Sequence, residues 1–414
     1  MKQPTTQREF ALDVVRQLRA AGYESLWAGG CVRDQLLGIT PKDYDVATSA
    51  KPDEIHDLFG NRRTLAIGAA FGVITVLGPR SAGQIEVATF RTDAAYSDGR
   101  HPDSVTFTTA EEDARRRDFT INGLFYDPLA EQVVDYVNGQ RDLTDQVIRA
   151  IGDPHQRFDE DKLRLLRAVR FAAAFGFRIE EETFRAIQRR AADITSVSAE
   201  RIGAEIRRML TDAQRTTAVE LLRDSGLLPH VLPEVAALDS SAWQKTLRVL
   251  GELDGPTLPL ALAALLLCVE NTPVAGTVGR RLRYTTKEMD RAGWLLSNLA
   301  TIRAADEIAW PRLQRVLVHD GAEELLALHA AIAGPDDAAL AFCRERLAWP
   351  TERLNPAPLV DGADLIAHGL EPGPQFAALL ERIRDSQLDG HIASRTDALR
   401  LVDRLLAEGL DAPP

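Results

Sequence analysis

The stretch LWAGGCVRDQLLGITPKDYDVAT, residues 26–48, decides the fold. Leu26–Ala28 predicts a strand, the glycine pair after it a turn, and Cys31–Leu37 a short helix. Asp43-Tyr44-Asp45 then leads into a second run of strand-forming residues. This succession of strand, turn, helix and strand predicts a unit that combines helices with a β-sheet.

The glycine pair in this stretch is a candidate phosphate site. Gly29 and Gly30 precede a helix N-terminus, where backbone N–H groups can approach a phosphate closely and the helix dipole adds attraction. Arg33, in the first turn of that helix, can add a charge-assisted contact. A turn with a purely structural role is the alternative interpretation of the two glycines.

Two carboxylates follow at strand spacing. Side chains at positions i and i+2 of a strand share a face, so Asp43 and Asp45 are expected to face one spot and to suit Mg²⁺. A solvated turn is the alternative. Glu86 interrupts the apolar strand GQIEVATF, with Ile85 and Val87 on the opposite face, and either faces solvent or joins the two aspartates.

Outside this stretch, the pattern of secondary-structure signals changes once along the chain. A helix with a capping box at Thr6 and Glu9 precedes it, and short strand-like runs continue to about Val137. Beyond about residue 143 strand signals nearly vanish and helical periodicity takes over. We therefore expect an α+β protein: a head of mixed β-sheet with helices, followed by an all-α neck, body and tail. The expected domains are 1–143, 144–210, 211–333 and 334–414.

Composition indicates the compartment in which the protein is expected to function. Its 414 residues are 45% hydrophobic and 27% charged, as in ordinary globular proteins. The three cysteines are widely spaced and form neither a disulfide framework nor a metal pair. The first residues lack an apolar signal core, and the longest apolar run, Leu260–Val269, is too short for a membrane span. A cytoplasmic protein without a membrane partner is expected.

The decisive stretch also resembles a known family. GGCVRDQLLG followed by DYDVAT is similar to the signature of the polymerase-β-like nucleotidyltransferases. More narrowly, it resembles the class II tRNA nucleotidyltransferases, or CCA-adding enzymes, and the related bacterial poly(A) polymerases. Four further segments resemble family motifs in the expected order: a loop at Phe90–Pro102, the RRD motif within Asp113–Asp127, the EDxxR motif within Gly152–Phe171, and a neck-helix motif at Ser198–Ile206.

The resemblance implies a function and a site. It implies a polymerase-β-like head (palm) over residues 1–143, a neck that recognises the nucleotide base, and a tail that binds tRNA. The implied reaction is template-independent addition or repair of the tRNA 3′ CCA end from CTP and ATP, which releases pyrophosphate by two-metal phosphoryl transfer. Asp43, Asp45 and Glu86 are the expected catalytic residues, with Mg²⁺ on Asp43 and Asp45. The helical body and tail would contact the acceptor stem and elbow of tRNA.

The RRD motif supplies further candidates. Arg116 and Arg117 are expected to serve the triphosphate or the ribose, and Asp118 to orient these two arginines. Without the family context, the arginine run would be interpreted as a solvated charge run.

The EDxxR segment predicts a helix that starts at Glu160–Arg164 and places Asp161, Arg164, Arg167 and Arg170 along one stripe. In the family this helix reads the incoming base. A carboxylate and a guanidinium complement the edges of cytosine and adenine and mismatch those of uracil and guanine. Arg167 and Arg170 would be left for phosphate or for buttressing. The alternative is a solvent face with an Asp161–Arg164 salt bridge.

Other segments favour full CCA addition over poly(A), A-only or CC-only activity. GAAFGVITV at Gly68–Val76 resembles the form found in tRNA-directed enzymes, and the loop keeps Asp93, Asp98 and Arg100. Pro358–Leu399 resembles the tail of longer tRNA enzymes, and its GLEPGP is a helix–turn–helix joint. A non-catalytic RNA-binding protein on the same fold is the remote alternative. Oligomeric state is not predicted.

Three remaining features need an interpretation. Cys31 is expected to be a packed neutral thiol, and His319-Asp320 to be structural, because no matching ligand set for an HD phosphohydrolase is found. The net charge of −12 argues at first against an RNA partner. However, residues 162–208 hold 11 Lys or Arg against 6 Asp or Glu, so a basic excess lies beside the inferred site.

Overall fold

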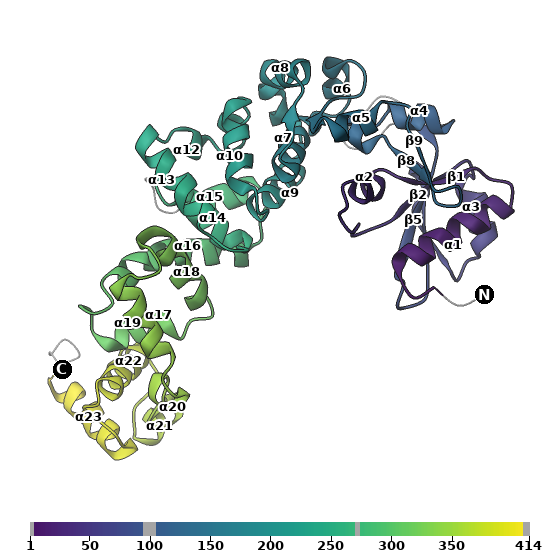
Figure 1. Cartoon of the computed structure of the whole chain (residues 1–414). Helices are drawn as coiled ribbons and strands as arrows, with labels where there is room; N and C mark the ends of the chain where they lie inside the picture. The colour runs from purple at the N-terminus through teal and green to yellow at the C-terminus, as the bar shows by residue number, and fades with distance from the viewer. Residues whose placement is uncertain (1–3, 94–104, 270–273, 409–414) are drawn as a thin grey trace. The chain divides into compact units, whose positions relative to one another are not determined.

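The computed structural model describes residues 4–93, 105–269 and 274–408. Contacts divide the chain into two units. The first is Met1–Asp239 with Arg281–Tyr284, and the second is Ser240–Arg280 with Thr285–Pro414. Strands gather in the early part of the first unit and helices make up the rest (Figure 1), so the predicted α+β class is confirmed. The four-domain division at residues 143, 210 and 333 stays a prediction.

A seven-stranded mixed sheet forms the centre of the head. The spatial order is β3-β4-β5-β2-β1-β8-β9. The pair β2 and β5 is parallel, and the other neighbouring pairs are antiparallel. The bounds are β1 Ser25–Ala28, β2 Asp45–Thr48, β3 Thr64–Gly68, β4 Val73–Leu77, β5 Gln84–Thr89, β8 Phe125–Asp127 and β9 Gln132–Val134. A separate hairpin joins β6 Arg91–Asp93 to β7 Val105–Phe107.

The two faces of the sheet pack against different elements. Helix α1 (Gln7–Ala20) packs against β1, β2 and β5, and the Thr6–Glu9 capping box predicted for it is present. A cluster that includes Leu26, Ala47 and residues of α4 (Ala110–Arg115) fills the other side. Because side chains alternate along a strand, Asp45 shares the face of Ala47. The Asp45 carboxylate therefore lies on the face of the sheet that packs against this cluster. The remaining α-helices of the head are α2 Gly30–Leu36, α3 Pro52–Phe59 and α5 Gly139–Thr144.

Helices follow the head within the first unit. They are α6 Pro154–Glu160, α7 Arg164–Phe175, α8 Glu181–Arg190, α9 Ala199–Leu210, α10 Arg215–Asp224, α11 Leu228–Val231 and α12 Pro233–Ala236. One short parallel pair, β10 Val147–Ile148 and β11 Arg178–Ile179, interrupts them. Asp98 and Arg100, predicted in the loop after β6, lie outside the described residues, and so does the side chain of Asp93.

The predicted helix start at Glu160 is wrong. Helix α6 ends at Glu160, Asp161 has an extended backbone (φ −144°, ψ 103°), and α7 begins at Arg164. The physical reason is local: the Asp161 carboxylate accepts the Leu163 N–H at 3.0 Å, which competes with helical backbone bonding. Asp161 therefore lies in the joint between two helices instead of on the arginine stripe.

The second unit is all helical in its described part. Its helices are α13 Ser240–Gly251, α14 Leu258–Leu266, α15 Val274–Arg281 (whose last residue belongs to the first unit), α16 Thr286–Arg303, α17 Trp310–Leu317, α18 Ala322–Ala333, α19 Ala338–Leu347, α20 Thr351–Leu354, α21 Gly362–Ala367, α22 Gln375–Leu388 and α23 Arg395–Glu408. The predicted GLEPGP joint lies between α21 and α22, whose bounds confirm it. Of the described helices, none is long and apolar enough to cross a membrane.

Candidate active site

A polar cleft of about 640 Å³ lies within the first unit. Its walls hold both aspartates of the decisive stretch and all ten residues predicted to bind nucleotide. The lining residues are Gly29, Gly30, Arg33, Asp43, Asp45, Arg116, Arg117, Asp118, Asn122, Asp161, Arg164, Arg167, Arg170 and Phe171. Segments more than 100 residues apart in the sequence thus meet at one site, where six arginines lie beside four aspartates.

The carboxylates on the sheet repel one another. Asp45 is the first residue of β2, Asp43 precedes the strand, and Glu86 on β5 is the in-register neighbour of Asp45. Removal from water and, after it, the charge of Glu86 raise the pKa of Asp45 to about 6, although Arg117 opposes this. Glu86 is exposed and is absent from the cleft lining. Its role stays a prediction.

The aspartate pair suits a divalent cation. Within the described residues, no group of three or more His, Cys, Asp or Glu side chains is arranged to hold a metal ion. Asp43 and Asp45 would therefore supply two oxygen-bearing ligands and leave the other positions to water and phosphate. Mg²⁺ favours this combination, and a cation would stabilise the charge of Asp45, whose pKa is raised by burial and then by Glu86. The donor set fits Mg²⁺.

Gly29 allows an arginine to approach the turn. Its φ of +68° is a conformation that L side chains rarely adopt, and a Cβ atom there would lie 2.7 Å from Nη1 of Arg117. The Gly29 N–H donates to the carbonyl of Leu124 at 3.0 Å, which fixes the turn against the segment after the RRD motif. The backbone angle thus favours glycine here, and a larger residue would displace the end of the Arg117 side chain.

The arginine pair of the RRD motif is held by a residue that the sequence pattern did not single out. Asp113 on α4, which is 2% exposed, accepts from Arg116 Nε at 2.8 Å and from Arg117 Nη2 at 3.0 Å. The two guanidinium groups outweigh the effect of burial and lower the pKa of Asp113. The expectation that Asp118 orients Arg116 and Arg117 is therefore wrong. Asp113 is one turn upstream of the pair and can reach both.

Asp118 instead joins the head to α7. Its carboxylate accepts Arg167 Nε and Nη2 at 2.8 and 2.6 Å, and Asn122 Nδ2 at 2.9 Å. Asn122 in turn accepts Arg33 Nη1 at 2.5 Å. Burial alone would raise the pKa of Asp118, but Arg167, Asn122 and Arg164 outweigh it and lower that pKa to about 2. A continuous polar network thus connects α2, the RRD segment and α7.

The candidate base-reading pair is arranged without a mutual salt bridge. Asp161 pairs with Arg201 of α9 at 2.8 Å, whereas Arg164 pairs with Glu160 at 2.6 Å. Arg164 also donates to the backbone carbonyls of Arg157 and Arg116, at 2.9 and 3.1 Å. The alternative of an Asp161–Arg164 salt bridge on a solvent face is therefore wrong. Neighbours from other elements therefore hold both side chains. Arg201 holds Asp161, whereas Glu160 and the two carbonyls hold Nη1 and Nη2 of Arg164.

Five residues of the site were not predicted from the sequence. Asp113, Asn122 and Glu205 are buried polar residues, Arg201 of α9 pairs with Asp161, and Phe171 lines the cleft. Glu205 on α9 accepts from Arg170 Nε at 2.5 Å and forms a salt bridge with Arg208 at 2.8 Å. A signal existed for Glu205 and Arg201, since both belong to the segment that resembles the neck-helix motif, but their partners lie 35 and 40 residues away.

Two other predictions concern residues outside the chemistry. Cys31 is 3% exposed, and burial raises the pKa of its thiol to about 11, which confirms a packed neutral thiol. In the second unit the His319 ring stacks on Trp294 with centroids 3.8 Å apart, and Asp320 pairs with Arg291 at 2.7 Å. Both side chains of the His-Asp pair have structural partners.

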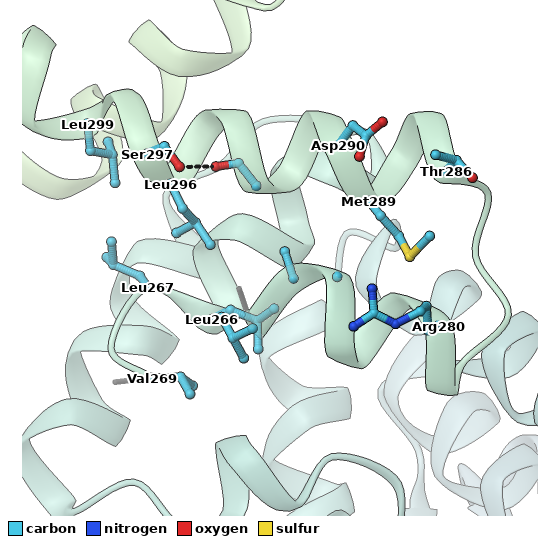
Figure 2. A pocket seen from close by; sticks show the side chains of 14 residues that line it. Leu266, Leu267, Val269, Arg280, Thr286, Met289, Asp290, Leu296, Ser297 and Leu299 are labelled. Carbon is cyan, nitrogen blue, oxygen red and sulfur yellow. Dashed lines mark hydrogen bonds between the residues drawn. The ribbon is translucent and has the colours of Figure 1, made fainter. Parts of the chain in front are cut away.

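A second hollow, of about 760 Å³, lies in the second unit. Figure 2 shows Met289 and Leu296 of α16 extending toward Arg280 and Leu266. The Ser297 hydroxyl donates to the Gly293 carbonyl of its own helix at 2.8 Å. The walls are mainly apolar, and Arg280 is the one cation among the lining residues. This chemistry does not suit a triphosphate, so the smaller cleft of the first unit is the candidate site.

Comparisons with known proteins identify the family of the chain. Residues 26–149 match the family described as the Poly A polymerase head domain, and residues 176–239 match the one described as a probable RNA and SrmB-binding site of polymerase A. Over 399 residues the chain is 33% identical to the CCA-adding enzyme of Lactobacillus helveticus, covering 94% of this chain and 95% of that relative.

Two further matches extend along the chain. The CCA-adding enzyme of Geobacillus kaustophilus is 34% identical over 383 residues, or 91% of each chain. The crystal structure of the Bacillus stearothermophilus CCA-adding enzyme in complex with CTP superposes with a TM-score of 0.81, at 28% identity and over 99% of each chain. The likeness therefore includes both units as well as the head.

Proposed function

The chain belongs to the family of CCA-adding enzymes, and on that premise we propose that it adds or repairs the 3′-terminal CCA of tRNA. The substrates are CTP and ATP, the acceptor is the 3′-hydroxyl of tRNA, and the product besides the extended tRNA is pyrophosphate. No nucleic-acid template takes part, so the protein itself selects the base.

One observation carries the proposal: a single cleft holds the aspartate pair, the glycine turn, six arginines and the Asp161–Arg164 pair. A nucleoside triphosphate has matching parts, because its phosphates seek cations and its base edge seeks donors and acceptors. The relative solved with CTP supports a nucleotide in the corresponding fold. We therefore assign the arginines and glycines of the cleft to the nucleotide.

The family needs a divalent metal, and we propose Mg²⁺, held by Asp43 and Asp45. When bound, Mg²⁺ lowers the pKa of the attacking hydroxyl and neutralises charge that develops on the phosphates. Glu86 lies next to Asp45 on the neighbouring strand and adds negative charge beside it. We assign Glu86 to holding the cation there through its charge, beside the two ligands.

The chain's own side chains then position the reactants. Arg116 and Arg117, held by Asp113, would face the triphosphate or ribose from the head. Arg33, Arg167 and Arg170 would approach from α2 and α7. Positioning and electrostatic stabilisation account for most of the catalysis of phosphoryl transfer, so groups fixed before the substrate arrives are well suited to it.

Base selection is assigned to Asp161 and Arg164. Cytosine and adenine each present an amino donor beside a ring acceptor, and a carboxylate with a guanidinium offers the complementary acceptor and donor. Uracil and guanine present a carbonyl where the amino group should be, which leaves polar groups of the site unpaired. Arg201 and Glu160, which hold the two side chains, keep them from pairing with each other.

An extension assay tests the proposal. Purified protein is incubated with transcripts of one tRNA that end before C74, C75 or A76, with labelled CTP, ATP, UTP or GTP in turn. CCA addition requires C, C and A to be added in order and growth then to stop. Long A-tails on an unrelated RNA would identify a poly(A) polymerase. Addition of only A or only CC would identify a partial enzyme, and no extension of any end would favour an RNA-binding protein.

We place this reaction in the cytoplasm. The three cysteines are free thiols, two of them buried, as is usual in a reducing compartment. Fractionation of cells with an antibody to the chain would test this placement.

A further inference from the structure

Three arginines of the cleft gather around one aromatic ring. Phe171 of α7 is 6% exposed and lines the cleft. The guanidinium carbons of Arg170, Arg167 and Arg33 lie 4.0, 5.2 and 5.3 Å from the centroid of its ring. Arg167 and Arg170 come from the same helix, whereas Arg33 comes from α2 of the head. One ring therefore contacts cations from two separate helices, α2 and α7.

The ring itself is fixed by other aromatic groups. Phe119 meets it edge to face, with centroids 5.9 Å apart and an interplanar angle of 79°. Phe175, one turn further along α7, lies nearly parallel to it at 6.0 Å, and the Arg33 guanidinium carbon is 4.7 Å from the Phe175 centroid. Edge-to-face and offset parallel arrangements are the favoured ones. Phe171 thus has a defined orientation, which a cation–π contact requires.

Carboxylates reach the three arginines from outside this ring. Arg33 pairs with Asp34 at 2.7 Å, Arg167 with Asp118 at 2.6 Å and Arg170 with Glu205 at 2.5 Å. Glu205 also lies 4.0 Å from Nη1 of Arg167, so it pairs with two of the three arginines, and none of these three carboxylates pairs with all of them. The ring of Phe171 is the group that all three arginines share.

Packing alone does not account for this arrangement. Three guanidinium carbons lie within 5.3 Å of the centroid of this one ring, whereas, among the described residues, the Trp349 ring has two arginine neighbours and the Phe59 ring has one. Like charges repel, and the negative face of an aromatic ring offsets part of the cost of bringing guanidinium groups together in a partly buried site. An aliphatic side chain of similar volume would fill the same space without attracting the cations.

We propose that Phe171 is a positioning residue, whose ring holds Arg33, Arg167 and Arg170 together for the triphosphate of the incoming nucleotide. The inference rests on the proposed function, since it assigns these arginines to the nucleotide. It adds that the electron distribution of the ring, and not only its size, sets the affinity for the triphosphate.

A fluorination series tests this role. Phe171 is replaced by 4-fluoro-, 3,5-difluoro- and 3,4,5-trifluorophenylalanine, which weaken the negative face of the ring in steps and change its shape little. Binding of ATP, CTP and inorganic tripolyphosphate is measured by calorimetry. We expect the dissociation constants to rise stepwise to about tenfold at the trifluoro variant. KM for CTP and ATP should rise in parallel, with kcat nearly constant and the thermal midpoint unchanged.

Phe59 provides the matched control. It is also 6% exposed and has one arginine, Arg63, over its ring at 5.8 Å, but it lies on α3 away from the cleft. The same series at Phe59 should leave tripolyphosphate binding unchanged. Phe171→Leu should weaken binding about as much as the trifluoro variant, and Phe171→Tyr should restore it.

The outcomes separate this inference from the proposed function. Equal affinity across the Phe171 series, even if Phe171→Leu binds weakly, would reduce the residue to packing and overturn the inference. Absence of tripolyphosphate binding in the wild type would overturn it as well. Graded binding without extension of any tRNA would support the role of Phe171 and contradict the proposed reaction.

Discussion

Asp118 accepts two hydrogen bonds from Arg167, at 2.8 and 2.6 Å, and so ties the RRD segment of the head to helix α7. The same carboxylate accepts from Asn122, which holds Arg33. Asp118 and Arg167 are 49 positions apart, and their contact joins two walls of the cleft. It is a structural contact with consequences for both stability and activity.

Asp118→Asn should lower stability in a pH-dependent way. The native pKa of Asp118 is about 2, below the ordinary 3.8, so its charge stabilises the fold fully above about pH 4. The contribution, about 2 kcal/mol, is lost as the pH falls from 4 toward 2. The gap between the thermal midpoints of wild type and variant should therefore be largest near neutral pH and shrink below pH 4. A gap that stays constant from pH 7 to pH 3 would contradict this assignment.

Asp45→Asn should abolish activity without loss of stability. The variant removes a predicted Mg²⁺ ligand, and we expect extension of tRNA to fall by more than about 100-fold. It also removes a charge that burial and then the neighbouring Glu86 disfavour, so the thermal midpoint should stay equal or rise. Asp57→Asn, at an exposed carboxylate of α3, is the control and should keep full activity. A midpoint that drops together with the activity would point to a structural carboxylate.

Gly29→Ala should combine backbone strain with displacement of Arg117. Both effects follow from its φ of +68° and from the 2.7 Å that would separate the new Cβ from Arg117 Nη1. We expect a loss of about 1–3 kcal/mol in stability and a KM for CTP and ATP raised about tenfold, since Arg117 is assigned to the triphosphate or ribose.

Gly38→Ala separates these two effects. Gly38 has a φ of +72°, but a Cβ atom there would have no heavy atom within 4 Å, so the variant carries a comparable strain without the clash. It should lose stability and keep the wild-type KM. Equal KM values in the two variants, measured by steady-state extension, would remove Gly29 from the nucleotide site.

Gly203→Ala should destabilise the first unit. Gly203 lies in α9, and a Cβ atom there would be 2.1 Å from the Leu282 carbonyl oxygen. The Tyr284 hydroxyl also donates to the Gly203 carbonyl at 3.1 Å, so the segment Arg281–Tyr284 packs closely on this helix. We expect a loss of more than about 2 kcal/mol, measured by urea unfolding.

The matched variant is Gly293→Ala in helix α16, where no heavy atom lies within 4 Å of the new Cβ. It should stabilise the chain by about 0.5–1 kcal/mol through the better helix propensity of alanine. If both variants shift the unfolding midpoint in the same direction, the close packing at Gly203 does not control stability.

Local spacing predicted the parts of the site that are local. The glycine turn, the aspartate pair and the RRD arginines lie within short stretches, and all of them line one cleft. The seven-strand order, with β2 parallel to β5, was not predicted, because the pairing of Asp45 with Glu86 joins strands separated by β3 and β4. Strand neighbours are set by tertiary packing, which a single sequence pattern does not record.

Partners of the charged residues were the least predictable feature. Arg170 pairs with Glu205, 35 residues away in the sequence, and Asp161 pairs with Arg201, 40 residues away. The start of α7 was also missed, because the bond from Leu163 N–H to Asp161 outweighs the helical pattern of the surrounding residues. Asp113 was within reach of a local argument, since it lies three and four residues before the arginines that it holds.

Arg164→Ala should damage nucleotide discrimination more than tRNA binding. The side chain is 8% exposed, reaches the cleft, and is held by Glu160 and by the carbonyls of Arg157 and Arg116. Without its guanidinium, the preference for CTP and ATP over UTP and GTP should fall about fivefold or more, because each good bidentate contact to a base edge is worth about 1–3 kcal/mol of discrimination. The dissociation constant for tRNA should change less than about twofold.

Arg164→Lys sharpens this test, because lysine keeps the charge but lacks the planar fork that matches a base edge. It should lose discrimination almost as strongly as the alanine variant. Arg185→Ala, at an exposed arginine of α8 paired with Glu181, should retain both properties. Competition assays with mixed nucleotides give the discrimination, and filter binding gives the tRNA affinity. Weakened tRNA binding with intact nucleotide selectivity in Arg164→Ala would place base recognition elsewhere in the cleft.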